Sequence, residues 1–236
     1  MAKIGKRIKA AREQIEVEKQ YALPEAVALL KSVAGKSGAK FKASETVDIA
    51  IRLGIDTKRQ TVRGVCGMPS GTGKTTIVGV VCGDDKTEEA KASGADFVWG
   101  DDFVEVVQND GVPNVDRLIA TPDMMATLGK VGRQLGPKGL MPNPKTGTVT
   151  KDITAAVKSA KSGQVEFRAD KGGNIHAGVG KVDFSADEIM ANVNAVKTAI
   201  LKAKPDDAKG IYVKRAFISS TMGPGIELNV ASLLED

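Results

Sequence analysis

The sequence predicts an α/β fold divided into two domains, and two patterns lead to this prediction. In the middle of the chain, short apolar strands alternate with helices, which is typical of a parallel sheet with crossover helices. On both sides of this region, helices accompany longer strands whose apolar residues alternate with period two, which indicates half-buried strands. The pattern changes twice along 236 residues, a length that suits one large or two ordinary domains.

The first third predicts two helices followed by two strands. The helices cover residues 3–17 and 24–33, and Pro24 suits the first turn of the second one. Residues 46–53 alternate between apolar and polar side chains, which predicts a half-buried strand, and residues 62–66 are the expected partner of that strand.

The middle third predicts the alternation of strands and helices in full. Its strands are expected at residues 77–81, 97–99 and 116–120. Its helices are expected at residues 87–92, 103–107, 123–135 and 152–161. The run of residues 136–145 is too rich in glycine and proline to form either element and is expected to be a surface loop.

The last third predicts a hairpin, a long helix and two further strands. Residues 164–168 and 174–178 flank a glycine-containing turn, which favours a hairpin. Ser185 and Glu188 have the spacing of a capping box, and Pro205 marks the end of the helix. Four apolar residues of this helix fall on one face: Ile189, Val193, Val196 and Ile200. Strands are expected at residues 211–219 and 226–230.

Composition and apolar runs exclude several classes of protein. The longest apolar runs, residues 26–30 and 77–82, are far shorter than the roughly 20 residues of a membrane helix. The basic N-terminus is not followed by the apolar region of a signal peptide, so we expect a cytoplasmic protein without a membrane partner. Cys66 and Cys82 lack metal-ligand spacing, and His176 is the only histidine. We therefore expect no metal, no cofactor and no enzymatic activity.

The positive charge is concentrated at the N-terminal end. The chain carries 34 basic and 29 acidic residues, a net charge of +5. Residues 1–69 contribute +7, residues 70–159 contribute −2, and residues 160–236 are neutral. This asymmetry indicates a polyanionic partner. A solvated basic helix without a partner explains the charge equally well.

The segment 67–76 resembles a phosphate-binding loop without matching it. In the G-x-x-x-x-G-K-[ST] pattern that leads to Lys74, the first glycine falls on position 68, which is Met68. Pro69 removes one of the backbone donors on which such a loop depends. A strand rather than a helix is expected to follow. We therefore interpret the segment as a glycine-rich hinge, with a P-loop-like nucleotide-binding protein as the alternative.

The aromatic content argues for one mode of nucleic-acid recognition over another. Nine aromatic residues are few for binding single strands by base stacking. Folded RNA is recognised by shape, phosphates and 2′-hydroxyls, which requires only a few polar contacts. Three segments are candidates, namely residues 40–42, 168–171 and 221–225. Residues 40–42 also fit a core position for Phe41 between two solvated lysines, and residues 168–171 also fit an ordinary charged turn. Met222, in contrast, has no evident structural role in its loop.

Short motifs throughout the chain carry a resemblance to a known family. They are Val62-Arg63-Gly64, Gly71-Thr72-Gly73-Lys74, Ala120-Thr121-Pro122-Asp123, residues 136–145, Gly147-Thr148-Val149, Ile175-His176, Gly180-Lys181 and Thr221-Met222-Gly223. In this order they resemble the bacterial ribosomal protein L1 family, whose members form the mobile side stalk of the large ribosomal subunit.

The resemblance implies a domain organisation and a function. A discontinuous α+β domain is expected from residues 1–69 plus 160–236, with a Rossmann-like domain, residues 70–159, inserted through two hinge strands. Pro69, Gly71 and Ser159 are the expected hinge residues. The implied partners are large-subunit rRNA, deacylated tRNA that leaves the exit site of the ribosome, and the protein's own operon mRNA, whose translation it represses.

The family's RNA contacts also carry over to particular positions of this chain. They are Lys40, Phe41 and Thr46 in the first third, Arg168, Asp170 and Lys171 in the turn of the expected hairpin, and Thr221, Met222 and Gly223 near the C-terminus. All nine lie outside the segment that is expected to form the inserted domain.

Overall fold

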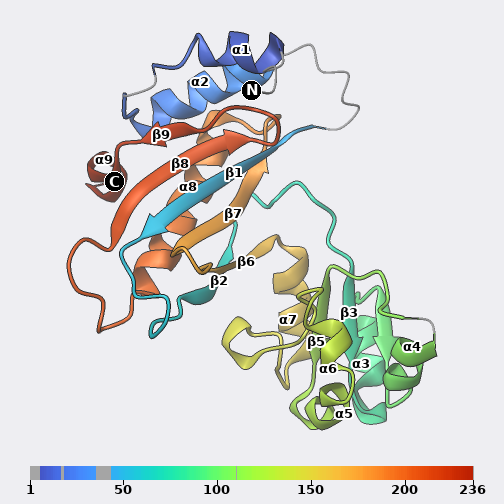
Figure 1. Cartoon of the computed structure of the whole chain (residues 1–236). Helices are drawn as coiled ribbons and strands as arrows, with labels where there is room; N and C mark the ends of the chain where they lie inside the picture. The colour runs from blue at the N-terminus through green and yellow to red at the C-terminus, as the bar shows by residue number, and fades with distance from the viewer. Residues whose placement is uncertain (1–5, 17–18, 36–43, 110, 236) are drawn as a thin grey trace. The chain divides into compact units, whose positions relative to one another are not determined.

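The chain folds into two compact units (Figure 1). The structure is a computed structural model that describes residues 6–16, 19–35, 44–109 and 111–235. Unit 1 comprises Met1–Gly73 and Val165–Asp236, and unit 2 comprises Lys74–Gln164. No helix within these described ranges is both long and apolar enough to cross a membrane.

Unit 1 is built on an antiparallel sheet. The strand order is β7-β1-β8-β9, and a separate two-stranded sheet pairs β2 with β6. The strands are β1 (Thr46–Leu53), β2 (Arg63–Gly67), β6 (Gln164–Arg168), β7 (Asn174–Lys181), β8 (Val213–Ser220) and β9 (Ile226–Leu228). The helices are α1 (Lys6–Arg12), α2 (Leu23–Gly35), α8 (Ala186–Lys202) and α9 (Val230–Glu235).

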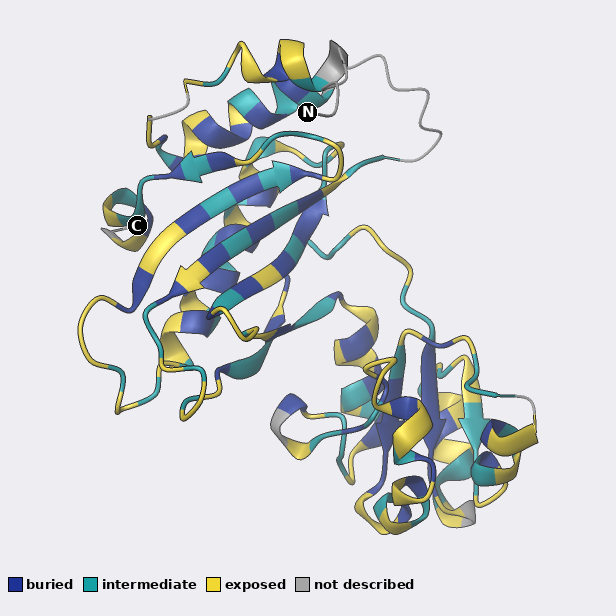
Figure 2. Cartoon of the chain, in the orientation of Figure 1, coloured by how far each residue is buried: buried dark blue, intermediate teal, exposed yellow. Residues whose placement is uncertain are grey.

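Helices α2 and α8 cover one face of this sheet, and on the other face Arg12, Ile15 and Lys19 lie close to Phe217 and Glu227 of β8 and β9. Figure 2 shows the alternation of burial along the strands, and in β1 every second residue from Val47 to Leu53 is buried. The buried face packs against α2 and α8. The four apolar residues predicted on one face of α8 are all buried, and its capping box at Ser185 is present. The alternate residues of β1 therefore point away from α2 and α8.

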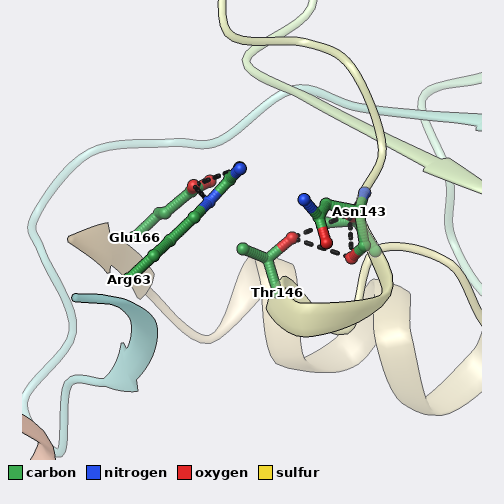
Figure 3. Close-up of polar contacts among 5 residues, drawn as sticks. Arg63, Asn143, Thr146 and Glu166 are labelled. Carbon is green, nitrogen blue, oxygen red and sulfur yellow. Dashed lines mark hydrogen bonds and ion pairs between the residues drawn. The ribbon is translucent and has the colours of Figure 1, made fainter. Parts of the chain in front are cut away.

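The pairing of the strands differs from two predictions. β1 pairs with β7 and β8, so residues 62–66 are not its partner. β6 and β7 do not form a hairpin with each other, because β6 pairs with β2. β7 buries alternate apolar residues just as β1 does, so the two complete one half-buried sheet. β2 and β6 are instead joined by an ion pair between Arg63 and Glu166 at 2.6 Å (Figure 3). The last expected strand is also shorter than predicted, since α9 begins at Val230.

Unit 2 contains a parallel sheet with helices on both faces. The strand order is β4-β3-β5, and both pairs are parallel, as the alternation of strands and helices predicts. The strands are β3 (Val78–Val81), β4 (Phe97–Trp99) and β5 (Arg117–Ala120). The main helices are α3 (Thr87–Ala92), α4 (Phe103–Asn109) and α7 (Ile153–Lys161). One core includes Phe103 and Leu128, and the other includes Ile119 and Val157.

The helix expected over residues 123–135 is broken into short pieces. A 3-10 turn, Pro122–Met124, leads into α5 (Met125–Gly129), and α6 (Gly132–Leu135) follows after an interruption. Glycine is a poor helix former, and two glycines flank the interruption. The prediction of one continuous helix over residues 123–135 was therefore wrong.

The glycine- and proline-rich loop after α6 is ordered by its own polar groups. Thr146 Oγ1 donates to the Asn143 carbonyl at 3.0 Å (Figure 3), and the Asn143 N–H donates to Thr148 Oγ1 at 2.8 Å. Ala120 N in turn donates to the Thr148 carbonyl at 2.9 Å. These bonds hold the end of the loop against β5, so the segment is a fixed surface loop, as its composition predicts.

Two carboxylates secure the start of β3 and give unit 2 a defined pH response. Asp96 accepts from Val78 N at 2.9 Å, and Asp116 accepts from Lys74 Nζ at 2.6 Å and from Ile77 N at 3.1 Å. The bond from Val78 lowers the pKa of Asp96, and the bond from Lys74 lowers the pKa of Asp116. A carboxyl whose pKa is lower in the folded state stabilises the fold above its unfolded pKa, roughly 3.9.

We therefore expect unit 2 to lose stability as the pH falls from about 5 towards the lowered pKa values of these two carboxyls. Urea unfolding at neutral pH and under acid conditions, followed by Trp99 fluorescence, measures this loss. The double variant Asp96→Asn, Asp116→Asn keeps an acceptor at each position and removes the titration. It is expected to show a smaller difference between the two conditions, and an unchanged difference would contradict the assignment.

Candidate nucleic-acid interface

The structure joins two of the predicted site residues from opposite ends of the sequence. Thr46 begins β1, and Thr221 directly follows β8, which pairs with β1. Thr221 Oγ1 accepts from Thr46 N at 3.0 Å and donates to the Thr46 carbonyl at 3.2 Å. The Thr221 N–H also donates to that carbonyl, at 3.0 Å. The threonine pair therefore fixes the loop 221–225 at the start of β1.

This loop presents a methionine without a packing role. The Met222 side chain is exposed by 47%, an unusual position for a large apolar residue. Gly223 closes the turn, since its N–H donates to the Ser220 carbonyl at 3.0 Å. A Cβ on Gly223 would lie 2.5 Å from Ser220 Oγ. Gly223 thus fits a tight turn without displacing the Ser220 hydroxyl, and the Met222 side chain is exposed.

The second predicted group lies in the turn between β6 and β7. The Asp170 carboxylate accepts from the N–H groups of Gly172 and Asn174, both at 2.8 Å. The bond from Asn174 lowers the pKa of Asp170, so this carboxyl is ionised at neutral pH. Arg168 and Lys171 are exposed. Asp170 thus shapes the turn, and the two cations are available to phosphate groups.

The structure places these two groups near opposite ends of β1. Thr46 is the first residue of β1, whereas Arg52, near the other end, pairs with Asn174 beside the turn. Thr46 and Arg52 are six positions apart along the strand, which corresponds to roughly 20 Å. The predicted residues therefore do not form one cluster. They bracket the face of the sheet opposite α2 and α8.

Further polar residues on this face were missed by the sequence analysis. Arg52 lies between Asn174 of β7 and Arg215 of β8, and all three are at least partly exposed. His176 lies in the middle of β7, with Nε2 3.9 Å from Asp170 Oδ2. The period-two alternation of β1 already placed Arg52 on the polar face. The neighbours of Arg52 depend on the strand pairing, which the sequence did not predict.

The other predicted residues are two that the structure does not describe and three that were expected in the hinges. Lys40 and Phe41 lie outside the described residues. Pro69 and Gly71 follow β2, at the end of the first chain segment of unit 1, and Gly71 has a φ of 71°. Ser159 lies inside α7 rather than in a loop, so the second connection between the units consists of the residues after that helix.

The glycine-rich segment also lacks the geometry of a phosphate loop. Lys74 is paired with Asp116 at 2.6 Å, and the next element after it is β3 rather than a helix. The Ser70 N–H is already used, because it donates to Asn192 Oδ1 at 3.1 Å. Among the described residues, no three or more His, Cys, Asp or Glu side chains come together in a group that could hold a metal ion.

The fold defines a two-unit α/β protein, and unit 1 carries a polar sheet face with Arg52, His176 and Arg215 and a threonine-anchored loop at one end. Comparison with known proteins assigns the chain more narrowly. Residues 30–224 match the ribosomal protein L1p/L10e family. The chain is 50% identical over 233 residues to the large ribosomal subunit protein uL1 of Orientia tsutsugamushi (strain Ikeda), which covers 98% of this chain and 91% of the relative. The chain therefore belongs to the ribosomal protein L1 family and is not an enzyme, as the sequence motifs predict.

Proposed function

We propose that this protein is a component of the large ribosomal subunit and that the polar sheet face of unit 1 binds large-subunit rRNA at the side stalk. The observation that carries the proposal is the Thr46–Thr221 pair, which holds an exposed Met222 at one end of the face. Exposed cations, including Arg168 and Lys171, lie at the other end. This arrangement suits a folded RNA that is gripped at two points across one surface.

We further propose that the two domains have different roles. Residues 1–69 plus 160–236 form the rRNA-binding domain, and the inserted domain, residues 70–159, swings on two connections. This movement assists the release of deacylated tRNA from the exit site of the ribosome. Separate apolar cores in the two units and the glycine-rich segment after Pro69 support such motion.

The same face also serves translational repression. An operon mRNA that mimics the rRNA site binds the residues that bind rRNA, so bound rRNA excludes it. We expect Met222→Ala to lower the affinity for both RNAs by a similar factor. If the two RNAs bound at separate sites, the affinity for only one of them would fall. The protein acts in the cytoplasm, on the ribosome and on its own message.

Competition binding tests the specificity of the full chain. A labelled stalk rRNA fragment is displaced by unlabelled fragment or by an unrelated folded RNA of equal length at fixed salt. We expect the unrelated RNA to compete at least about tenfold less well, a difference of about 1.4 kcal/mol. Equal competition together with a steep salt slope would indicate a nonspecific basic protein instead. Lys202→Ala, on the exposed side of α8, serves as the control variant for loss of one positive charge away from the face.

A further inference from the structure

We propose that Asn192 is a positioning residue that ties the first connection to unit 1 as far as Gly71, so that the joint in this connection consists of Thr72 and Gly73. The inference rests on the proposed movement of the inserted domain and specifies where the chain bends. It moves the joint beyond Pro69 and Gly71, the hinge residues expected from the sequence.

The side-chain amide of Asn192 is fully buried and makes three hydrogen bonds. The residue lies in α8 and has an exposure of 0%. Its Oδ1 accepts from Ser70 N at 3.1 Å, and its Nδ2 donates to the carbonyls of Gly71 at 3.0 Å and Val179 at 2.7 Å. A buried amide is costly unless its groups are paired, so these bonds hold the connection in place. Two of the three bonds go to consecutive residues of the connection.

The segment before Gly71 is held to unit 1 at further points. Met68 is buried in the core of unit 1, with an exposure of 4%. The Gly71 N–H donates to the Met68 carbonyl at 3.1 Å and closes a turn. Movement at Pro69 would break this turn and both bonds to Asn192. The chain therefore remains part of unit 1 through Gly71.

The chain is anchored to unit 2 from Lys74 onward. Lys74 binds the Asp116 carboxylate at 2.6 Å, and that carboxylate also accepts from Ile77 N. Only Thr72 and Gly73 lie between the Asn192 bonds and this second anchor. Gly73 has a φ of 67°, which favours glycine, and it lies against the Phe184 ring of unit 1, where a Cβ would come within 3.0 Å, so bending at Gly73 separates only this side-chain contact. Two residues contribute four soft dihedrals, and the glycine widens their range.

Hydrogen exchange of the unaltered full chain, resolved for single amides by NMR, is the first test. The Ser70 amide is expected to exchange at least about tenfold more slowly than the amides of Thr72 and Gly73, because its bond opens only with part of unit 1. Equal rates for these amides would overturn the proposal. This measurement does not depend on whether any variant folds.

The variant Asn192→Ala is the second test. Fluorescent dyes on cysteines that replace Lys202 in unit 1 and Lys130 in unit 2, both exposed, report the distribution of distances between the units. Asn192→Ala is expected to broaden this distribution and to speed exchange at Ser70. Asn194→Ala, two residues along the same helix, is the matched control and is expected to change neither. An unchanged distribution in a folded Asn192→Ala protein would overturn the proposal.

The proposed function and the joint fail in different ways. A single narrow distribution in the unaltered protein, unaffected by RNA, would refute the swing of the inserted domain and the joint together. A broad distribution combined with rapid exchange at Ser70 would refute only the joint. Binding of the stalk rRNA fragment is expected to persist in Asn192→Ala, which separates a change in the joint from unfolding of unit 1.

Discussion

Replacing Phe103 by alanine is expected to destabilise unit 2 by about 3–5 kcal/mol, the usual cost of removing a buried phenylalanine. Phe103 has an exposure of 0%, and its ring packs on Trp99 with the ring centres 5.1 Å apart. Domains are stable by only about 5–15 kcal/mol, so such a loss removes much of the total. Unit 1 has a separate core and is expected to remain folded.

Trp99 makes this prediction measurable, because it is the only tryptophan of the chain and lies in unit 2. Its fluorescence during urea unfolding reports unit 2, while binding of a stalk rRNA fragment reports unit 1. Phe103→Ala is expected to shift the fluorescence transition and to leave RNA binding within about twofold, less than 0.5 kcal/mol.

The reciprocal variant is Ile218→Ala, at a buried position of β8 in unit 1. It is expected to abolish RNA binding at moderate urea, with the Trp99 transition unchanged. Equal shifts of the Trp99 transition in Phe103→Ala and Ile218→Ala would show that the two units unfold together. That result would contradict the proposal that residues 70–159 form an independent inserted domain.

Local sequence signals predicted most elements of the fold, because each element is specified by neighbours in the chain. The capping box at Ser185 and the apolar stripe of α8 depend on residues within one helix. The alternation of residues 46–53 likewise depends on one strand alone. Strand pairing depends on distant partners, and so the partners expected for β1 and β6 were wrong. The helix expected over residues 123–135 is interrupted between Gly129 and Gly132, where two residues of low helix propensity lie close together.

The same distinction applies to the site. Family motifs identified Thr46 and Thr221 separately, but their mutual hydrogen bonds follow from the pairing of β1 with β8. Arg215 became a neighbour of Arg52 for the same reason. Asn192 did leave a signal, since it lies one residue before Val193 and three after Ile189, among the apolar positions of α8. A polar residue there indicates a buried hydrogen-bonding role, but its partners at Ser70 and Gly71 are 121 or 122 residues away.

Removing the contacts at the start of β1 is expected to weaken binding of the stalk rRNA fragment by about 1–3 kcal/mol, the scale of one good specific contact. Thr221→Val keeps the size of the side chain and removes the hydroxyl that bonds both the N–H and the carbonyl of Thr46. Met222→Ala removes the exposed side chain and leaves the threonine pair intact. Thr198→Val and Leu201→Ala, on α8, are matched controls with little expected effect.

The salt dependence of binding separates the two ends of the face. Met222 carries no charge, so Met222→Ala is expected to lower affinity at every salt concentration and to leave the slope of affinity against salt unchanged. Arg168→Ala and Lys171→Ala each remove a phosphate contact and are expected to reduce that slope by about 1. If Met222→Ala bound with the affinity of the unaltered protein, the loop would have no part in the interface, and the grip would depend on charge alone. Unrelated RNAs would then compete almost as well as the stalk fragment. The affinity of Met222→Ala and the competition experiment therefore test independently whether the loop 221–225 gives the binding its specificity.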